Sequence, residues 1–285
     1  MIESIIEDVK RQFAQGNMIT KLIIANIIVF LILILIKAFT GYNPSVYQSI
    51  IDFLALPSEP SKLITRPWTL FTYMFLHEGF WHLGWNMLML YWFGRIIGDL
   101  IGDHRMLPLY IMGGLLGGVF FLLYSNLVGE VSNVRGASGS VTCLIMAAAC
   151  VAPEYIIRLI LIGDVKLKYI ALFLIVLDIA MIAEHNNAGG RMAHLGGAAL
   201  GAYFIYALRR GRDITDFKGS FSFLDKPTKT KMDVVHNKKR PVKKKDVYRP
   251  SNQEKVDAIL DKINASGYDS LTEEEKEILY QASKK

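Results

Sequence analysis

The chain has 285 residues, of which 52% are hydrophobic and 20% are charged, and its mean hydropathy is +0.30. A soluble globular protein of this length carries more charge and fewer apolar residues, so the composition argues against a soluble protein and predicts a membrane protein. Residues 1–208 carry thirteen basic and thirteen acidic side chains, so the whole formal net charge of +6 lies in residues 209–285. The apolar and the charged parts of the chain are therefore expected to be separate units.

The first segment, residues 1–18, is amphipathic and of mixed charge. A secretory signal peptide has a short apolar core behind a basic end, and the apolar run that follows this segment is too long for such a core. We expect residues 1–18 to form a short helix on the cytoplasmic membrane surface, with its apolar face against the lipid.

Six apolar runs follow, and a helix that crosses the ~30 Å hydrocarbon layer needs about 20 such residues. The runs are residues 19–38, 80–98, 105–125, 137–152, 168–184 and 190–208. The fourth run is short and rich in small residues, so it is expected to be enclosed by the other five helices. Six spans place both termini on one side, and the excess of Lys and Arg in the inner segments predicts that this side is cytoplasmic.

The first outer loop, residues 39–79, is long for a membrane protein and contains four prolines among many aromatic side chains. This mixture cannot form a spanning helix, but aromatic rings are favoured at the level of the lipid headgroups. We therefore expect this loop to lie embedded in the outer leaflet.

Four polar side chains lie inside the predicted spans, where each is costly and so indicates a functional site. They are His82 and Asn86 on the second span, Ser138 on the fourth and His194 on the sixth. These three spans run in the same direction, and each polar residue lies within the first two turns, so the four side chains have similar depth. We expect them to meet in a wet pocket beneath the outer surface.

The surroundings of the serine and of the histidine indicate acyl-transfer chemistry. Gly136 allows a tight turn before a helix begins near Ser138, which leaves unpaired N–H groups beside the hydroxyl. Gly197 and Gly201 lie after His194 at a spacing that permits close helix packing, which would bring the imidazole within reach of the hydroxyl. A serine with an imidazole partner and nearby oxyanion donors is what acyl transfer requires.

This ordered set of motifs resembles the rhomboid family of intramembrane serine proteases over residues 20–208. The motifs are Gly136-Ala137-Ser138-Gly139, His82-x-x-x-Asn86, Ala193-His194-x-x-Gly197-x-x-x-Gly201 and Pro67-Trp68-Thr69-Leu70-Phe71-Thr72. The resemblance implies an all-α membrane protein, a bundle of six transmembrane helices with an embedded first outer loop.

The resemblance also implies a catalytic dyad without a third acid. Ser138 would be the nucleophile, and His194 the general base and then the general acid, with Asn86, His82 and the backbone N–H of Ser138 stabilising the oxyanion. In the family His77 looks structural. Family members often carry an aromatic ring against the histidine, four residues after the serine, where this chain has Thr142.

Other protease chemistries fit the residues less well. His77 and His82 are five residues apart rather than four, so they do not share the helical face that a zinc site requires. An aspartyl protease needs two facing carboxylates, and Asp178 is the only acid deep in any span. Asp178 is expected to lie deeper than the dyad and to be a buried hydrogen-bond anchor rather than a catalytic group.

The sequence implies neither a disulfide nor a bound cofactor. Cys143 and Cys150 are seven residues apart on one predicted helix, so they predict neither a disulfide nor a structural zinc site. No metal or cofactor is implied, because a serine and a histidine suffice for the reaction. The alternative interpretations are a transporter and an inactive rhomboid-like factor that binds other membrane proteins in quality control. Separately, the alternative for His82 and Asn86 is a purely structural clamp on the first outer loop.

Residues 210–250 read as a basic, disordered linker, with ten basic and two acidic side chains in 226–249. Contact with anionic lipid is the preferred role, and no motif supports nucleic-acid binding. Residues 251–285 are predicted to form a small helical pair. Its capping boxes are Ser251-x-x-Glu254 and Thr272-x-x-Glu275, and Gly267 ends the first helix.

Together these features predict a protease of a bacterial inner membrane, with both termini cytoplasmic. Its partners are the lipid bilayer and transmembrane protein substrates, whose helices must unwind locally because helical carbonyls are already hydrogen-bonded. Small helix-weakening residues are the expected preference at the cleavage point.

Overall fold

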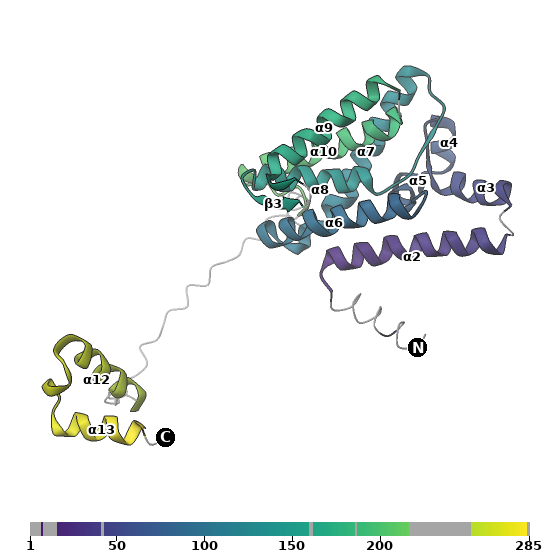
Figure 1. Cartoon of the computed structure of the whole chain (residues 1–285). Helices are drawn as coiled ribbons and strands as arrows, with labels where there is room; N and C mark the ends of the chain where they lie inside the picture. Colours follow the sequence, from purple (N-terminus) through teal and green to yellow (C-terminus); the bar gives the residue numbers. More distant parts are fainter. Residues whose placement is uncertain are drawn as a thin grey trace, which may run out of the picture. The chain divides into compact units, whose positions relative to one another are not determined.

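The computed structural model describes residues 7, 16–40, 43–159, 162–185, 187–216 and 252–283. The chain divides into two compact units, Met1–Lys226 and Pro227–Lys285, and the larger unit is a helical bundle (Figure 1). The predicted surface segment 1–18 and the predicted basic linker 210–250 lie largely outside the described residues.

Each of the six predicted apolar runs is a helix in the structure. These helices are α2 (Met18–Phe39), α6 (Phe80–Ile101), α7 (Met106–Val128), α8 (Ser138–Val151), α9 (Leu167–Ala183) and α10 (Ala188–Arg209). Among the described residues, two helical stretches are long and apolar enough to cross a membrane by length and composition, Met18–Phe39 and Asp103–Val128, and α8 is a shorter apolar helix. The predicted helices are therefore confirmed, while the number of six spans stays a prediction.

Polar groups at their ends hold α2 and α7 in place. The side chain of Asn17 caps α2 by accepting a hydrogen bond from the backbone N–H of Thr20, at 3.0 Å. The Met18 N–H donates to the Asp103 carboxylate at 2.9 Å, which ties α2 to the turn before α7. Helix α7 ends at Gly129 with a φ of 76°, a left-handed conformation that favours glycine.

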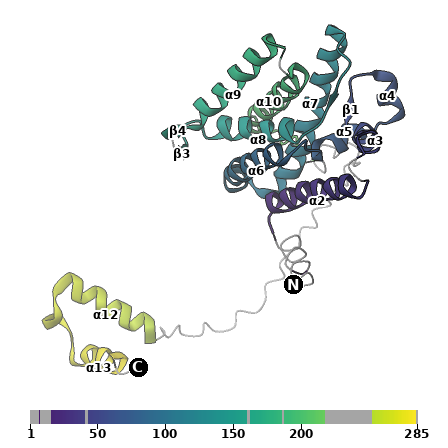
Figure 2. The ribbon, with the colours of Figure 1, turned by 45° about the vertical axis from the view of Figure 1, so that its right-hand side comes forward.

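Helix α8 lies at the centre of the bundle and is mostly buried. It packs against α6, α7, α9 and α10, whereas α2 packs on α6 and α7. In Figures 1 and 2, α6 lies between α2 and α8. The prediction that all five other helices enclose α8 is therefore corrected to four, because α2 covers the outer side of its neighbours.

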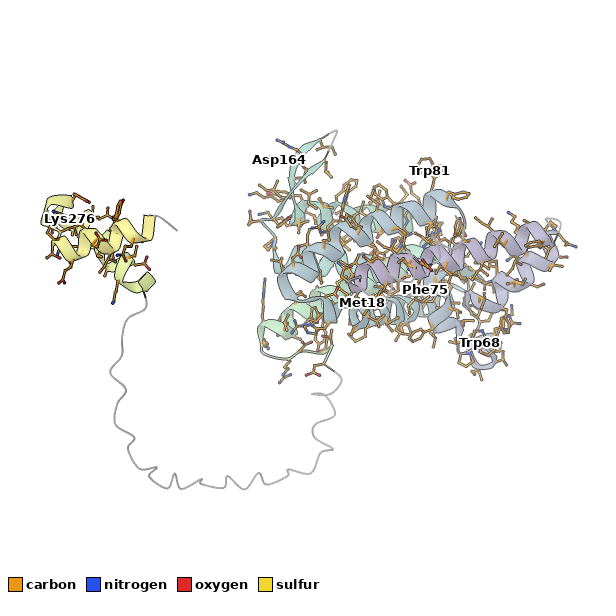
Figure 3. All side chains as sticks on the ribbon, turned by 90° about the horizontal axis from the view of Figure 1, so that it is seen from below. Met18, Trp68, Phe75, Trp81, Asp164 and Lys276 are labelled. Atoms are coloured by element: carbon orange, nitrogen blue, oxygen red, sulfur yellow. The ribbon has the colours of Figure 1, made fainter. Side chains whose placement is uncertain are left out.

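The first loop is built from short helices rather than irregular chain. It contains α3 (Pro44–Leu54), β1 (Leu56–Pro57), α4 (Pro60–Thr65), α5 (Thr69–Thr72) and the 3₁₀ helix η1 (Tyr73–Phe75). Strand β1 pairs antiparallel with β2 (Asn133–Val134), which precedes α8. The indole Nε1 of Trp68 donates to the Phe53 carbonyl at 2.8 Å, and Figure 3 shows Trp68 at the edge of the unit. The depth of this loop in a leaflet stays a prediction.

A hairpin that the sequence analysis did not predict connects α8 to α9. Strands β3 (Ile156–Leu159) and β4 (Gly163–Lys166) pair antiparallel, and Asp164 marks their projection beyond the helices in Figure 3. The carboxylate of Glu154, just before the hairpin, bonds the amines of Lys166 and Lys168, which lowers its pKa to about 2. These contacts fix the entry to α9.

Large apolar side chains are exposed along the outer helices. On α2 and α9 they include Leu31, Leu35, Leu172, Phe173 and Val176, each about half exposed or more. A soluble monomer rarely exposes contiguous apolar surface of this kind. The surface is that of a membrane protein, with the backbone polar groups satisfied inside helices.

The smaller unit is a helical hairpin of α12 (Asn252–Ser266), η3 (Tyr268–Ser270) and α13 (Glu273–Ser283). The Thr272 N–H donates to the Glu275 carboxylate at 2.8 Å, and the Glu275 N–H donates to the Thr272 hydroxyl at 3.3 Å, which confirms the second capping box. Gly267 follows α12 with a φ of 79°, as predicted. The first box lies partly outside the described residues, since Ser251 is not described.

Candidate active site

A cavity of about 1160 Å³ opens between α6, α8, α9 and α10. All four predicted site side chains, Ser138, His194, His82 and Asn86, line it. Most of the remaining wall is apolar and reaches the β3–β4 hairpin. The structure therefore brings the polar groups of three helices to one chamber, as their matched depth along the chain predicted.

Ser138 is the first residue of α8, so its hydroxyl lies at the start of the central helix. The first helical hydrogen bond runs from the Val141 N–H to the Ala137 carbonyl, at 2.9 Å. The N–H groups of the first turn thus have no partner within the helix, so this end of α8 carries unpaired donors and a partial positive charge.

Gly136 shapes the turn that leads into Ser138. Its φ of 137° lies in the region that favours glycine, and its N–H donates to the Tyr73 carbonyl at 2.9 Å. A Cβ at Gly136 would lie 2.9 Å from Nε2 of His82 and 3.5 Å from Oγ of Ser138. The imidazole and the hydroxyl therefore border the same small space, which only a glycine leaves open.

Helices α8 and α10 pack with their backbones in contact. A Cβ at Gly197 would lie 2.0 Å from the Gly139 carbonyl oxygen, and a Cβ at Gly201 would lie 2.2 Å from that of Cys143. The predicted stripe of small residues is confirmed as the line of contact. Because Gly139 is the residue after Ser138, this contact holds the start of α8 against the helix that carries His194.

Asp178 on α9 contacts the imidazole of His194. Nδ1 of His194 lies 3.0 Å from Oδ1 and 3.2 Å from Oδ2 of Asp178, and Oδ1 also accepts a bond from Nη1 of Arg191 at 2.9 Å. Asp178 is 3% exposed. The prediction of a buried hydrogen-bond anchor is confirmed, and its partner is the imidazole of His194, a contact that was not predicted. The fold brings α9 and α10 together at this level.

Arg191 is the second partner of this carboxylate and was not predicted from the sequence. An acid inside an apolar helix needs a partner, and the periodicity of α9 could not show which residue supplies it. Arg191 lies one turn before His194 on α10, so both side chains can reach the same carboxylate. This spacing was the available signal.

The second imidazole of the site belongs to His82. Its Nδ1 lies 3.5 Å from the Glu78 N–H, which favours a ring with the proton on Nε2, the nitrogen that faces Gly136. Nδ2 of Asn86 donates to the His82 carbonyl at 2.8 Å and has a second N–H for another acceptor. Both side chains can therefore offer a donor to the cavity.

The imidazole of His77 packs against that of His82. The two rings pack edge to face, with their centroids 5.1 Å apart. Burial, and then the neighbouring imidazole, lower the pKa of His77 to about 4, and its Nδ1 lies 3.3 Å from the Phe75 carbonyl. A neutral, buried ring in contact with His82 fits the structural role that was expected.

Two contacts near Ser138 complete the site. Oγ1 of Thr142 donates to the Ser138 carbonyl at 2.8 Å, so this side chain is hydrogen-bonded to its own helix. It does not supply the ring contact that an aromatic residue at this position would give to the histidine. At the edge of the cavity, Nε of Arg135 lies 2.7 Å from the carboxylate of Glu78. This ion pair was not predicted from the sequence. Among the described residues, no group of three or more His, Cys, Asp or Glu side chains is placed to hold a metal ion.

Comparison with known proteins gives two matches along the chain. Residues 65–211 match the model of the Rhomboid domain, and residues 243–285 match a family of unknown function, DUF6576. RHOMBOID-like protein 12, mitochondrial, of Arabidopsis thaliana is 34% identical over 158 residues, which cover 50% of this chain and 47% of that protein. The human Presenilin-associated rhomboid-like protein, mitochondrial, is 26% identical over 198 residues, which cover 66% of this chain and 47% of that protein.

A yeast relative is named Rhomboid protein 1, mitochondrial, from Saccharomyces cerevisiae; it is 29% identical over 135 residues, which cover 46% of this chain and 38% of that protein. The chain thus spans about half the length or less of these relatives. All three are named as mitochondrial proteins, so the predicted bacterial inner membrane was wrong.

Proposed function

Because the chain belongs to the rhomboid family, we propose that it is an intramembrane serine endopeptidase that cleaves other membrane proteins in or near their transmembrane segments. One observation carries this proposal. Ser138 opens the central helix inside a cavity that His194 also lines, and His82 and Asn86 line the same cavity with hydrogen-bond donors.

The proposed reaction uses Ser138 as the nucleophile and His194 as the base. Nε2 of His194 takes the hydroxyl proton while Oγ attacks the scissile carbonyl, and the imidazolium then gives this proton to the leaving amine. Water repeats the sequence on the acyl-enzyme and releases Ser138. The tetrahedral oxyanion is stabilised by the Ser138 N–H and by donors from His82 and Asn86, aimed where negative charge develops.

The shape of the cavity supports a transmembrane substrate. Its wall continues from the polar end along apolar side chains of α6 and α9, among them Trp85, Met89, Phe173 and Leu174. An apolar wall beside a polar end fits a segment that is apolar along its length and locally unwound at the cleaved bond. A helical substrate would present carbonyls that are already hydrogen-bonded.

Cleavage of a reporter transmembrane protein in liposomes tests the proposal. Ser138→Ala is expected to abolish cleavage. Ser140→Ala, a matched change two residues further along α8 at another buried hydroxyl, is expected to keep it. Undiminished cleavage by Ser138→Ala would contradict the proposal. Capture of the reporter without any cleavage by the unaltered chain would instead favour the inactive, rhomboid-like binding factor.

A further inference from the structure

The carboxylate of Asp178 holds the nitrogen of His194 that the proposed reaction leaves unused. Nδ1 of the ring lies within hydrogen-bonding distance of both carboxylate oxygens, and the side chain of Asp178 is only 5% exposed. A carboxylate accepts hydrogen bonds and cannot donate one, so the proton of a neutral ring sits on Nδ1. Nε2 then keeps its lone pair for the proton of Ser138.

We propose that Asp178 is a positioning residue, which makes the site a Ser138–His194–Asp178 triad rather than a dyad. The inference rests on the proposed protease function and deepens it. Asp178 fixes the tautomer and the orientation of His194, and its negative charge stabilises the imidazolium that forms when Ser138 attacks. It does not touch the substrate and does not take up a proton.

The rest of the structure explains why the ring needs this partner. Thr142 turns its hydroxyl back to the Ser138 carbonyl and offers no ring for the imidazole to pack against. The buried residues of α9 are Leu167, Ala171 and Asp178. A buried carboxylate is costly and adds less to stability than an apolar side chain of the same size. The presence of this carboxylate on a helix with so few buried residues is therefore explained by its contact with the imidazole of His194.

Asp178 also pairs with Arg191, so a purely structural role for the carboxylate must be distinguished from its proposed role in positioning His194. If Asp178 only neutralised this arginine, then removal of both charges together would remove the need for it. The two side chains differ in access to water, since that of Arg191 is 26% exposed and that of Asp178 is 5% exposed. Arg191 can thus be solvated in part without the carboxylate.

The test compares Asp178→Leu, Arg191→Met and the double variant in the full-length protein. Leucine has the same branching and the same number of side-chain heavy atoms as aspartate, although its methyl groups are bulkier than carboxylate oxygens, and it cannot accept a hydrogen bond in any rotamer. We expect Arg191→Met to lower kcat by less than about tenfold, and Asp178→Leu to lower it by about 10²-fold or more with KM within a few-fold. The double variant is expected to be as slow as Asp178→Leu, because the imidazole still lacks its partner.

Recovery of the double variant to the rate of Arg191→Met would overturn the inference, because the only role of Asp178 would then be to pair with Arg191. The double variant also covers the case in which Asp178→Leu does not fold alone, because it leaves no unpaired buried charge. Its rate is then compared directly with that of Arg191→Met.

Nitrogen NMR of ring-labelled histidine separates this inference from the protease function itself. We expect the His194 signal, assigned with His194→Gln, to show a protonated Nδ1 that is lost in Asp178→Leu. If Ser138 does not react in the unaltered chain, the protease function fails, while the NMR result still decides what Asp178 does. If Ser138 reacts equally fast with and without Asp178, the positioning role is overturned and the protease function stands.

Discussion

Helices α9 and α10 both pack against α8, but they do so in opposite ways. Helix α10 contacts the α8 backbone through Gly197 and Gly201, at distances that exclude even a methyl group. Helix α9 buries three residues, among them Asp178, and otherwise leaves large side chains around an open cavity. The spacing of the reacting groups is thus set by contact between backbones, whereas the space for a substrate is left by an apolar wall with a single polar anchor.

The largest effect is expected at the α8–α10 contact. Gly197→Ala places a methyl group 2.0 Å from the Gly139 carbonyl oxygen, so the helices must separate. We expect loss of activity by at least about 10²-fold and destabilisation of about 3 kcal/mol or more. Thermal unfolding and reporter cleavage measure both. The control is Gly84→Ala on α6, where no atom lies within 4 Å, and wild-type behaviour of Gly197→Ala would break the comparison.

The next effect concerns the oxyanion donors of α6. Asn86→Leu removes an amide from the cavity wall and leaves the α8–α10 contact untouched. We expect kcat to fall by about 10²- to 10³-fold, and the free energy of unfolding to fall by only about 1 kcal/mol for the lost bond to His82. Trp81→Phe, at a 92% exposed residue of the same helix, is the control. A loss of stability that accounts for the whole loss of activity would make Asn86 a structural clamp.

A third prediction concerns pH and stability. The pKa of His77 is about 4 in the folded chain, below its ordinary value of 6.5, so the unfolded chain binds a proton that the folded chain refuses. The contribution of the neutral His77 to the free energy of unfolding is therefore complete above pH 6.5. It is lost as the pH falls toward 4, and the loss amounts to roughly 3 kcal/mol. His77→Gln should flatten this part of the unfolding profile, whereas His104→Gln at an exposed histidine should not. An equal pH dependence in both variants would count against a buried, neutral His77.

The smallest effect is expected on the open side of the site. Leu174→Trp on α9 narrows the cavity. The KM for a transmembrane substrate should therefore rise by up to about tenfold, while labelling of Ser138 by a small reagent stays unchanged. Leu172→Trp, at a 59% exposed residue two positions earlier, is the matched control. Equal effects of the two changes would mean that the wall of α9 does not receive the substrate.

The sequence predicted the parts of the molecule that depend on short-range pattern. Apolar runs gave the six helices, because length and composition determine where a helix can be buried or can meet lipid. The matched depth of Ser138 and His194 predicted a shared chamber, and the glycines after His194 predicted the close contact that the structure contains. Each of these needs only helix geometry and the direction of the chain.

Other features depend on how helices rotate against each other, which no local pattern fixes. The contact between Asp178 and His194 was not predicted, because the position of Asp178 along α9 indicates only its depth, whereas the contact depends on the rotation of α9 against α10. The Arg135–Glu78 pair was missed for the same reason, since it joins segments whose approach is set by the whole bundle. The β3–β4 hairpin, by contrast, joins two runs that are neighbours in the chain, and it is a local feature that was overlooked in the sequence. The distribution of Lys and Arg could not identify the membrane that holds the protein.

The most direct test of whether His194 activates Ser138 is the rate at which a fluorophosphonate labels the full-length protein in detergent. Mass spectrometry then identifies the modified residue. The account predicts labelling at Ser138 that disappears in His194→Gln and persists in Ser140→Ala. Labelling at Ser138 that is equally fast without His194, or a folded protein that takes up no label, would contradict it.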